Sequence, residues 1–381
     1  MIIVTGGPGS GKSMIAVSLL FDLHNDDEDD YRVLYATGSV AITETMRRYP
    51  GKGSREFKDL FVYYRDLSLA KPNRLDVLIC DEAHRVRKTS TFRRQKKELR
   101  TGRPQLDELM TAARVPVFLL DEHQVVRPDE VGTVEEIVRH AGRKGYRIHH
   151  IELDGQFRCG GSAAYDEWVL QLLGLRTTKP TPWTGGDFDV RVANSPQEME
   201  DFLRAKHLSG EKARITAGYC WPWSKPRADG TLVPDVKIGD WSKPWNKKDS
   251  AVSGVAPPAS FWATDRRGFE QVGCIYTAQG FEYDWAGVIL GPDIVYNGEY
   301  LVVRRKSKVA ALNGTKSAPT PDAIFDRMVC NTYKVLLTRG LKGVVIYSVD
   351  PATQEFISGP IGSRGKIEAL LGPDLGFTGE G

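Results

Sequence analysis

The sequence Gly6-Gly7-Pro8-Gly9-Ser10-Gly11-Lys12-Ser13, near the start of the chain, is the clearest indication of its fold. It matches the pattern G-x-x-x-x-G-K-[ST] of phosphate-binding loops. The apolar run Ile2–Thr5 before it predicts a buried strand, and Lys12–His24 after it predicts a helix. A strand, a glycine-rich turn and a helix in this order favour nucleotide binding, and a glycine turn without a nucleotide is the alternative.

The loop has the chemistry that a nucleoside triphosphate needs. Glycines allow backbone N–H groups to curl around phosphate oxygens, and the N-terminus of the following helix adds its positive end. We expect Lys12 to reach the β- and γ-phosphates and the Ser13 hydroxyl to bind Mg²⁺. All eight residues of the stretch are therefore candidates for binding a nucleotide.

Polar side chains follow two further apolar runs. Leu75–Arg85 reads LDVLICDEAHR, a strand that ends in Asp81 and Glu82. We expect Asp81 to hold Mg²⁺ and Glu82 to polarise the attacking water as general base. Phe118–Gln124 reads FLLDEHQ, which places Gln124 at the carboxyl edge of the sheet, where it can contact the γ-phosphate. An acidic turn and an ordinary loop glutamine are the alternatives.

Short β-branched runs alternate with helical stretches along the chain, which is typical of α/β layers with a mainly parallel sheet. Further strands of the first half are expected at Val33–Ala36, Asp76–Cys80, Val115–Leu120 and Ile148–Glu152. Further helices are expected at Ala41–Arg48, Leu106–Ala113 and Val134–His140. Strands of the second half are expected at Asp187–Ala193, Arg214–Ala217, Val272–Tyr276, Gly287–Leu290 and Gly343–Tyr347. The sequence therefore predicts two α/β domains, residues 1–154 and 155–381.

Composition bounds the class of protein. The chain has 381 residues, of which 41% are hydrophobic and 27% charged, as in globular proteins with two domains. No apolar run reaches the ~18 residues of a membrane span and no signal peptide is visible, so we expect a cytoplasmic protein without a membrane partner. The five cysteines form no C-x-x-C pair. With a net charge of +3, nucleic-acid affinity must come from local patches.

Three regions break the pattern. Residues 221–261 form an irregular insertion, and the tail 359–381 is expected to be flexible. Five tryptophans in and beside the insertion could stack on unpaired bases or form the core of a small irregular domain: Trp221, Trp223, Trp241, Trp245 and Trp262. The run Arg85–Arg103 contains nine basic residues and one acidic residue, which suits either a nucleic-acid backbone or a solvated loop.

Arginines in the second half are candidates for the same reaction. Gly155–Arg158 reads GQFR after an expected strand, and Asn331–Gly340 reads NTYKVLLTRG, which places Arg339 just before another strand. Arginines that arrive from a second domain can neutralise charge on a transferring phosphoryl group. Surface arginines at helix ends are the alternative.

Taken in order, these motifs resemble those of the superfamily 1 helicases, and most of all a bacterial helicase-like group related to the C-terminal helicase domain of Schlafen proteins. The stretches that carry the resemblance are Val4–Ser13, Asp81–Arg85, Asp121–Gln124, Gln156–Cys159, Gly218–Trp223, Gly273–Gly291 and Thr332–Gly343. The resemblance implies two tandem RecA-like P-loop NTPase domains with ATP between them. It also implies that Arg158 and Arg339 act as γ-phosphate sensors and arginine fingers, and that Gly280 and Glu282 contact the nucleotide from the second domain.

The activity that the resemblance implies is that of a Mg²⁺-dependent ATPase motor acting on single-stranded DNA or RNA. The chain has no room for the large inserted subdomains of processive helicases, so we expect translocation, remodelling or sensing rather than strand separation. A fused or separate effector domain is a further expected partner. The alternatives are a nucleotide-gated switch that acts on a protein partner and a P-loop kinase, and the second arginine-bearing domain argues against the kinase.

Overall fold

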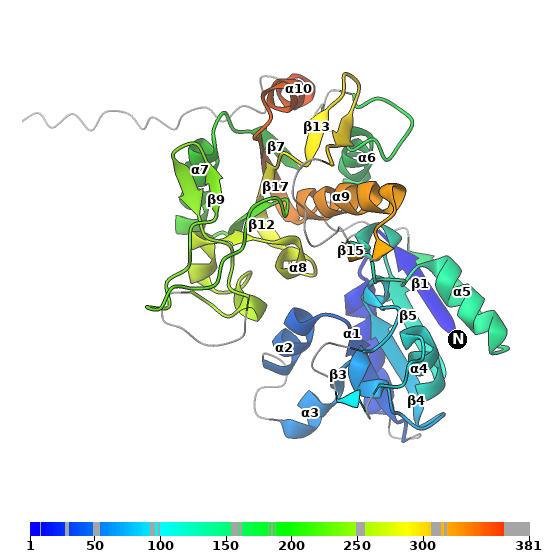
Figure 1. The fold of residues 1–381 in the computed structure, drawn as a ribbon. Coiled ribbons are helices and arrows are strands. Elements are labelled where there is room, and N and C mark those ends of the chain that lie inside the picture. Colours follow the sequence, from blue (N-terminus) through cyan, green and yellow to red (C-terminus); the bar gives the residue numbers. More distant parts are fainter. Residues whose placement is uncertain are drawn as a thin grey trace, which may run out of the picture.

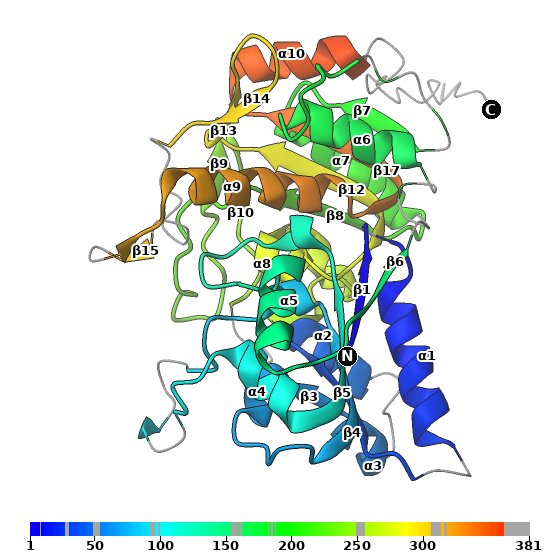
Figure 2. The same cartoon turned by 90° about the vertical axis from the view of Figure 1, so that its right-hand side faces the viewer.

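The computed structural model arranges the chain as two stacked lobes, each built on its own parallel sheet (Figures 1 and 2). It describes all residues except 8, 27–29, 49–53, 92–95, 98–99, 154–158, 160–161, 182, 184–185, 187, 249–255, 306–313, 316–317 and 362–381. Two candidate site residues, Pro8 and Arg158, and the predicted domain boundary at Asp154 lie outside the described residues. Within these described ranges, no helix is both long and apolar enough to cross a membrane.

The first lobe carries a six-stranded parallel sheet in the order β3-β2-β4-β5-β1-β6. Its strands are β1 (Ile2–Gly6), β2 (Val33–Thr37), β3 (Phe61–Tyr63), β4 (Leu75–Asp81), β5 (Ala113–Leu120) and β6 (His149–Leu153). Its α-helices are α1 (Lys12–His24), α2 (Val40–Arg48), α3 (Arg55–Asp59), α4 (Gln105–Ala112) and α5 (Val134–Arg143). The predicted strands and helices of this half are confirmed. The sequence missed β3 because three residues are too few to show alternation.

Successive side chains of each strand enter two cores on opposite faces of this sheet. Val4 and Ile79 pack with Leu20 of α1 on one face. Ile3 and Leu78 belong to the core that contains the apolar side of α4 on the other face. Burial of both faces is expected for a parallel sheet. It fixes the carboxyl ends of β1, β4 and β5 at one edge, where the candidate nucleotide-binding residues follow.

The second lobe carries a five-stranded parallel sheet in the order β11-β8-β12-β17-β7. Its strands are β7 (Asp189–Val192), β8 (Ala213–Ala217), β11 (Val272–Gly273), β12 (Tyr283–Leu290) and β17 (Gly340–Ser348). Its α-helices are α6 (Ala163–Leu172), α7 (Pro196–Leu208), α8 (Ile275–Ala278), α9 (Asp322–Leu337) and α10 (Pro351–Ile361). Short hairpins add β9 (Val236–Ile238) with β10 (Trp241–Lys243), β13 (Ile294–Tyr296) with β14 (Leu301–Val303), and β15 (Gly314–Thr315) with β16 (Ala318–Pro319). The predicted fold class, α/β with mainly parallel sheets and helices on both faces, is confirmed.

The strand predicted over Val272–Tyr276 is wrong in its second half, where α8 begins. The backbone N–H of Cys274 donates to the side chain of Asn246 rather than to a neighbouring strand. The Cys274 oxygen accepts from Thr277 and Ala278, which starts a helical turn. The apolar composition of the run gave no sign of this side-chain contact.

The insertion 221–261 contains more regular structure than its composition predicted. It includes the β9–β10 hairpin and the short 3₁₀ turn η6 (Ala259–Phe261). Trp241 and Trp245 pack into the core that covers one face of the second sheet, and Trp262 packs into the core on the other face. For these three tryptophans the predicted core of a small irregular domain is therefore wrong, because they pack into the cores of the second lobe. At the C-terminus, α10 extends to Ile361, past the predicted start of the tail.

One loop of the first lobe is anchored in the second lobe. Val126 follows β5 and the 3₁₀ turn η4 (Glu122–Gln124), and it is fully buried in the core that contains Phe281 and Phe325 of the second lobe. Asn331 of α9 donates a hydrogen bond to the Val125 oxygen across 2.9 Å. The lobes therefore meet close to the carboxyl end of β5.

Candidate functional site

The glycine-rich loop after β1 is shaped to receive an anion at the start of α1. Gly9 and Gly11 have φ angles of 80° and 86°, in the left-handed region that favours glycine. Lys12 donates hydrogen bonds to the backbone oxygens of Gly6 and Gly7, at 2.7 and 2.8 Å. Its ammonium group thus lies over the loop, where phosphate oxygens would compete with these carbonyls.

Ser13 and Asp81 form an oxygen pair suited to Mg²⁺. The Ser13 hydroxyl donates to Asp81 Oδ2 across 2.7 Å, and Tyr35 of β2 donates to the same oxygen across 2.5 Å. Burial and the neighbouring charge of Glu82 raise the pKa of Asp81. A hydroxyl and a carboxylate fit Mg²⁺ that is also bound by phosphates and water. Among the described residues, no cluster of three or more His, Cys, Asp or Glu side chains would hold a metal alone.

Glu82 occupies a strained and strongly charged position at the end of β4. Its φ of 57° lies in the left-handed region, which costs a residue with a side chain about 1–3 kcal/mol. Its Oε2 atom lies 2.9 Å from His84 Nε2 and 3.6 Å from Arg85 Nε. Burial alone would raise the pKa of Glu82, but contact with His84 and the charges of two arginines outweigh it and lower the pKa well below the usual range. Glu82 therefore stays a carboxylate that can orient water.

Gln124 presents a buried amide oxygen beside the same edge of the sheet. Its Nε2 donates to Asp121 Oδ2 across 3.0 Å, whereas its Oε1 has no hydrogen-bond partner among the described residues. Burial would raise the pKa of Asp121, but the charges of Lys334 and Lys12 outweigh it and lower the pKa. A buried acceptor without a donor calls for a ligand or a water molecule.

Lys12, Ser13, Glu82 and Gln124 line one cleft of about 470 Å³ at the junction of the lobes. Its described lining residues are Gly9, Ser10, Gly11, Lys12, Ser13, Met14, Ile15, Glu82, Gln124 and Glu282. A volume of this size is in the range of small-molecule and cofactor sites. The cleft brings candidate residues of the first lobe together with Glu282 of the second.

Two more candidates of the second lobe lie near this cleft without lining it. Gly280 has a φ of 93°, and a side chain there would lie 2.9 Å from Ile42 of α2, so glycine permits a close approach of the lobes. Arg339 is fully buried between α9 and β17, and its Nε donates to the Val335 oxygen across 2.9 Å. Arg339 is not among the described lining residues, but its charge contributes to the lowered pKa of Glu82.

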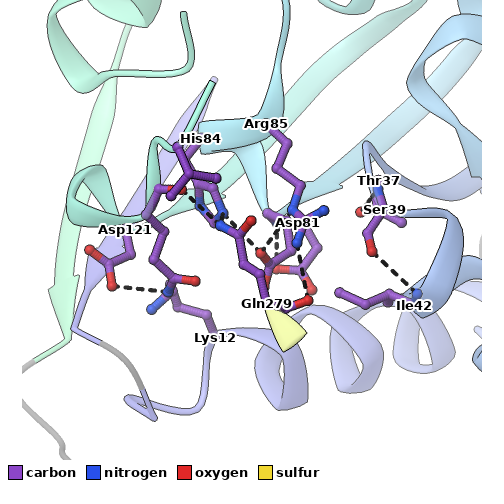
Figure 3. Close-up of polar contacts among 12 residues, drawn as sticks. Lys12, Thr37, Ser39, Ile42, Asp81, His84, Arg85, Asp121 and Gln279 are labelled. Atoms are coloured by element: carbon purple, nitrogen blue, oxygen red, sulfur yellow. Dashed lines mark hydrogen bonds and ion pairs between the residues drawn. The ribbon is translucent and has the colours of Figure 1, made fainter. Parts of the chain in front are cut away.

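Gln279 is a site residue that the sequence analysis missed. Its Nε2 donates to the backbone oxygen of Gln124 across 2.8 Å and lies 3.2 Å from His84 Nε2. Its backbone oxygen accepts from Arg85 Nη2 across 3.1 Å, and Figure 3 shows it between His84 and Arg85. The available signal was its place immediately before Gly280, within the stretch Gly273–Gly291 that carries the resemblance.

Lys334 is a second such residue. It lies on α9 with 1% of its surface exposed, and its Nζ lies 3.6 Å from Asp166 Oδ1. Its charge lowers the pKa of Asp121 and, after burial, the pKa of His123, both in the first lobe. The signal was a single lysine inside an otherwise apolar helical run.

A smaller pocket of about 120 Å³ lies on the other side of β4 from the cleft. Hydroxyl and guanidinium groups that follow β2, β3 and β4 dominate its wall. Its described lining residues are Thr37, Gly38, Val40, Tyr63, Tyr64, Arg65, Arg85, Arg87, Thr89, Ser90, Thr91 and Gln105. The segment that follows β4 thus contributes Glu82 to the large cleft and Arg85 to the small pocket.

The basic run after β4 does not form one uniform patch. Arg85 is buried against Gln279, and Arg103 pairs with Asp107 across 2.5 Å. Lys96 and Lys97 are exposed, while residues 92–95 and 98–99 lie outside the described part of the chain. The interpretation of Arg85 as part of a solvated loop is therefore wrong, because this arginine is buried at the lobe junction.

Comparisons with known proteins find chains that are similar to this one over most of its length. The chain is 24% identical to an uncharacterized protein of Saccharomyces cerevisiae, over 94% of this chain and 84% of that protein. Among solved structures, the arterivirus nonstructural protein 10 helicase with DNA aligns at a TM-score of 0.37 and 15% identity, over 94% of this chain and 62% of that chain. Pif1 from Bacteroides bound to single-stranded DNA aligns at a TM-score of 0.36 and 12% identity, over 93% of this chain and 89% of that chain.

A family model carries the stronger finding. The model described as Schlafen group 3, DNA/RNA helicase domain, matches residues 1–350. The resemblance to the Schlafen helicase domain is thereby confirmed. The chain belongs to the Schlafen group 3 DNA/RNA helicase domain family.

Proposed function

We propose that the chain is a Mg²⁺-dependent ATPase motor of the superfamily 1 helicase type, which couples ATP hydrolysis to movement along, or remodelling of, single-stranded DNA or RNA. Family membership supports a helicase-type NTPase. The observation that carries the proposal is the cleft in which Lys12, Glu82 and Gln124 of the first lobe face Glu282 of the second.

The first lobe would bind the nucleotide and prepare the attacking water. Backbone N–H groups of the loop Gly6–Ser13 and the Lys12 ammonium would hold the triphosphate. Ser13 and Asp81 would hold Mg²⁺, which when bound neutralises charge on the phosphates. Glu82 would orient the water and accept its proton. The same water could donate to the Gln124 amide oxygen, which otherwise has no partner among the described residues.

The second lobe would complete the site when the lobes close. Gly280 and Glu282 would contact the nucleotide, and Arg339 would supply positive charge to the leaving γ-phosphoryl group. Arg339 already lies close enough to influence the pKa of Glu82, which supports this role. The same role for Arg158 rests on the resemblance alone.

The small pocket supports a strand-binding site beside the ATP site. Arg65, Arg87 and the neighbouring hydroxyl groups suit backbone phosphates, because such groups supply most phosphate contacts in nucleic-acid complexes. Asp81 and Glu82 lie at the end of β4 next to the cleft, and Arg85 lies three residues further on in the wall of the pocket. A change at the γ-phosphate would therefore reach the strand site through one short segment.

We place this motor in the cytoplasm, working with a fused or separate effector domain.

ATP hydrolysis by the purified chain, measured with and without single-stranded DNA and RNA, tests the proposal. We expect Mg²⁺-dependent hydrolysis that single strands stimulate and that Lys12→Ala abolishes. Hydrolysis without stimulation would favour a nucleotide-gated switch with a protein partner. Absence of hydrolysis in the wild type, or hydrolysis by Lys12→Ala within twofold of it, would contradict the proposal.

A further inference from the structure

A row of aromatic rings leads from the lobe junction across the second lobe. It consists of Tyr276 on α8 and of Tyr219 and Trp223 after β8, and we call these three residues the aromatic row. The ring centroids of Tyr276 and Tyr219 are 6.1 Å apart, and those of Tyr219 and Trp223 are 5.8 Å apart. All three rings are half-buried. They follow the carboxyl ends of β11 and β8, the edge at which open α/β sheets bind ligands.

The outer end of the aromatic row is held rigidly. Trp245 is buried beneath it, with its ring centroid 5.7 Å from that of Trp223, and its indole N–H donates to the Pro222 oxygen across 2.8 Å. Lys248 Nζ donates to the Trp223 oxygen across 2.7 Å. The half-exposed indole is therefore presented at little further cost in conformational entropy, which favours binding.

Trp223 also differs from the other tryptophans of the insertion in the hydrogen bonding of its indole N–H. Trp221, Trp241 and Trp245 each donate the indole N–H to a protein oxygen. Trp223 makes no such hydrogen bond to any described residue. A large, rigid and partly exposed aromatic face with an available donor is typical of residues that dominate binding energy.

Cations flank the aromatic row at both ends. Lys248 Nζ lies 4.9 Å from the centre of the Trp223 ring, and the Arg127 guanidinium of the first lobe lies 3.9 Å from the centre of the Tyr276 ring. Asp129, two residues after Arg127, pairs with Arg87 of the small pocket across 3.6 Å. The row therefore begins beside the pocket that we assign to phosphates. Aromatic faces with flanking cations fit a chain of bases and phosphates.

We propose that the aromatic row binds single-stranded nucleic acid by stacking unpaired bases, with Trp223 as the outer stacking face and with Lys248 and Arg127 as phosphate contacts. This inference rests on the proposed function and extends the strand path from the small pocket across the second lobe. Every base has a face that can stack on an aromatic side chain, so the aromatic row would bind single strands without sequence preference.

The test compares Trp223→Ala with Trp223→Phe in the full chain, with thermal unfolding as a control of folding. The probes are a labelled single-stranded oligonucleotide of about 16 nucleotides and an abasic strand of the same length. We expect Trp223→Ala to weaken binding of the base-containing strand about 5- to 150-fold and to leave binding of the abasic strand unchanged. Trp223→Phe should retain most of the affinity. Lys248→Ala should instead lower the slope of log K against log salt by about 0.7.

Tryptophan fluorescence gives a second readout that does not need the alanine variant to fold. Binding of the base-containing strand should quench the wild type more than it quenches Trp223→Phe, and the abasic strand should remove this difference. Equal quenching in both proteins, or equal affinity of Trp223→Ala and the wild type for the base-containing strand, would overturn the aromatic row and leave the proposed function standing. A wild type that binds neither strand would overturn both.

Discussion

The side-chain amide of Gln279 in the second lobe donates a hydrogen bond to the backbone oxygen of Gln124 in the first lobe, across 2.8 Å. The same nitrogen lies 3.2 Å from the His84 ring, which in turn contacts the Glu82 carboxylate across 2.9 Å. The Gln279 side chain thus contacts two loops. One carries Gln124, the proposed γ-phosphate contact, and the other carries Glu82, the proposed general base.

Gln279→Ala should lower kcat more than it lowers ATP affinity, because the loop Gly6–Ser13 that would hold the phosphates does not depend on this amide. A buried acceptor left without its donor costs about 1–3 kcal/mol, which corresponds to roughly 5- to 150-fold in rate. Steady-state kinetics and equilibrium nucleotide binding check it. Gln279→Glu, which keeps the size and loses the donor, should behave like the alanine variant. Lost affinity at unchanged kcat would contradict this prediction.

Glu82→Gln should bind ATP and fail to turn it over. Ser13 and Asp81 keep their oxygens, whereas an amide cannot accept the proton of the attacking water, an effect of about 10²- to 10⁴-fold. Single-turnover hydrolysis beside nucleotide affinity is the measurement. If weak binding accompanies the lost turnover, Glu82 has a structural role instead.

Arg339→Ala should reduce hydrolysis by about a thousandfold, or on the order of 4 kcal/mol in the barrier, while ATP still binds. The guanidinium acts on charge that grows only in the transition state. Because Arg339 is fully buried, thermal unfolding of Arg339→Lys controls for misfolding. Affinity that collapses while kcat at saturation survives would make Arg339 a ground-state ligand.

Replacement of Arg93, Arg94, Lys96 and Lys97 by alanine should weaken binding of single strands and reduce its salt dependence. Four lost phosphate contacts would lower the slope of log K against log salt by roughly 2.8. Binding titrations over a range of salt concentrations provide the slope. An unchanged slope would assign this run to a solvated loop.

Acid should weaken the second lobe through Glu270. The hydrogen bond from Arg204, opposed by burial and helped by Lys243, lowers the pKa of Glu270 from 4.5 to about 2. Because the folded value is the lower one, its contribution to stability is present above pH 4.5 and is lost as the pH falls towards 2. Melting temperatures against pH should therefore fall less steeply for Glu270→Gln than for the wild type. Parallel curves would show that the carboxylate contributes nothing.

Local patterns predicted the site residues of the first lobe well, because each of them follows directly after an apolar strand in the sequence. Gly6–Ser13, Asp81 and Glu82 are read from neighbours in the sequence, and their surroundings are set by one sheet edge. The sequence did not predict Gln279 and Lys334 as site residues, because their importance comes from interactions with residues more than a hundred positions away. Such partners leave no periodicity in the chain.

The same limit explains two of the corrected interpretations. Arg85 looked like one of many surface cations, but its guanidinium reaches the backbone of Gln279 in the other lobe. Val272–Tyr276 looked like a strand because apolar residues serve strands and buried helices equally well. In both cases a single distant side chain or backbone oxygen decided the outcome.

Val126 gives the junction a mechanical property. This residue follows Gln124 by two positions in the first lobe, but its side chain is buried in the core of the second lobe. When the lobes separate, Val126 can leave this core, which costs about 1.5–3 kcal/mol for a buried side chain of this size. Otherwise Val126 stays in the core and moves the Gln124 loop with the second lobe. In the second case, opening of the lobes would move Gln124 away from the attacking water, so that product release and resetting of the water position become one event.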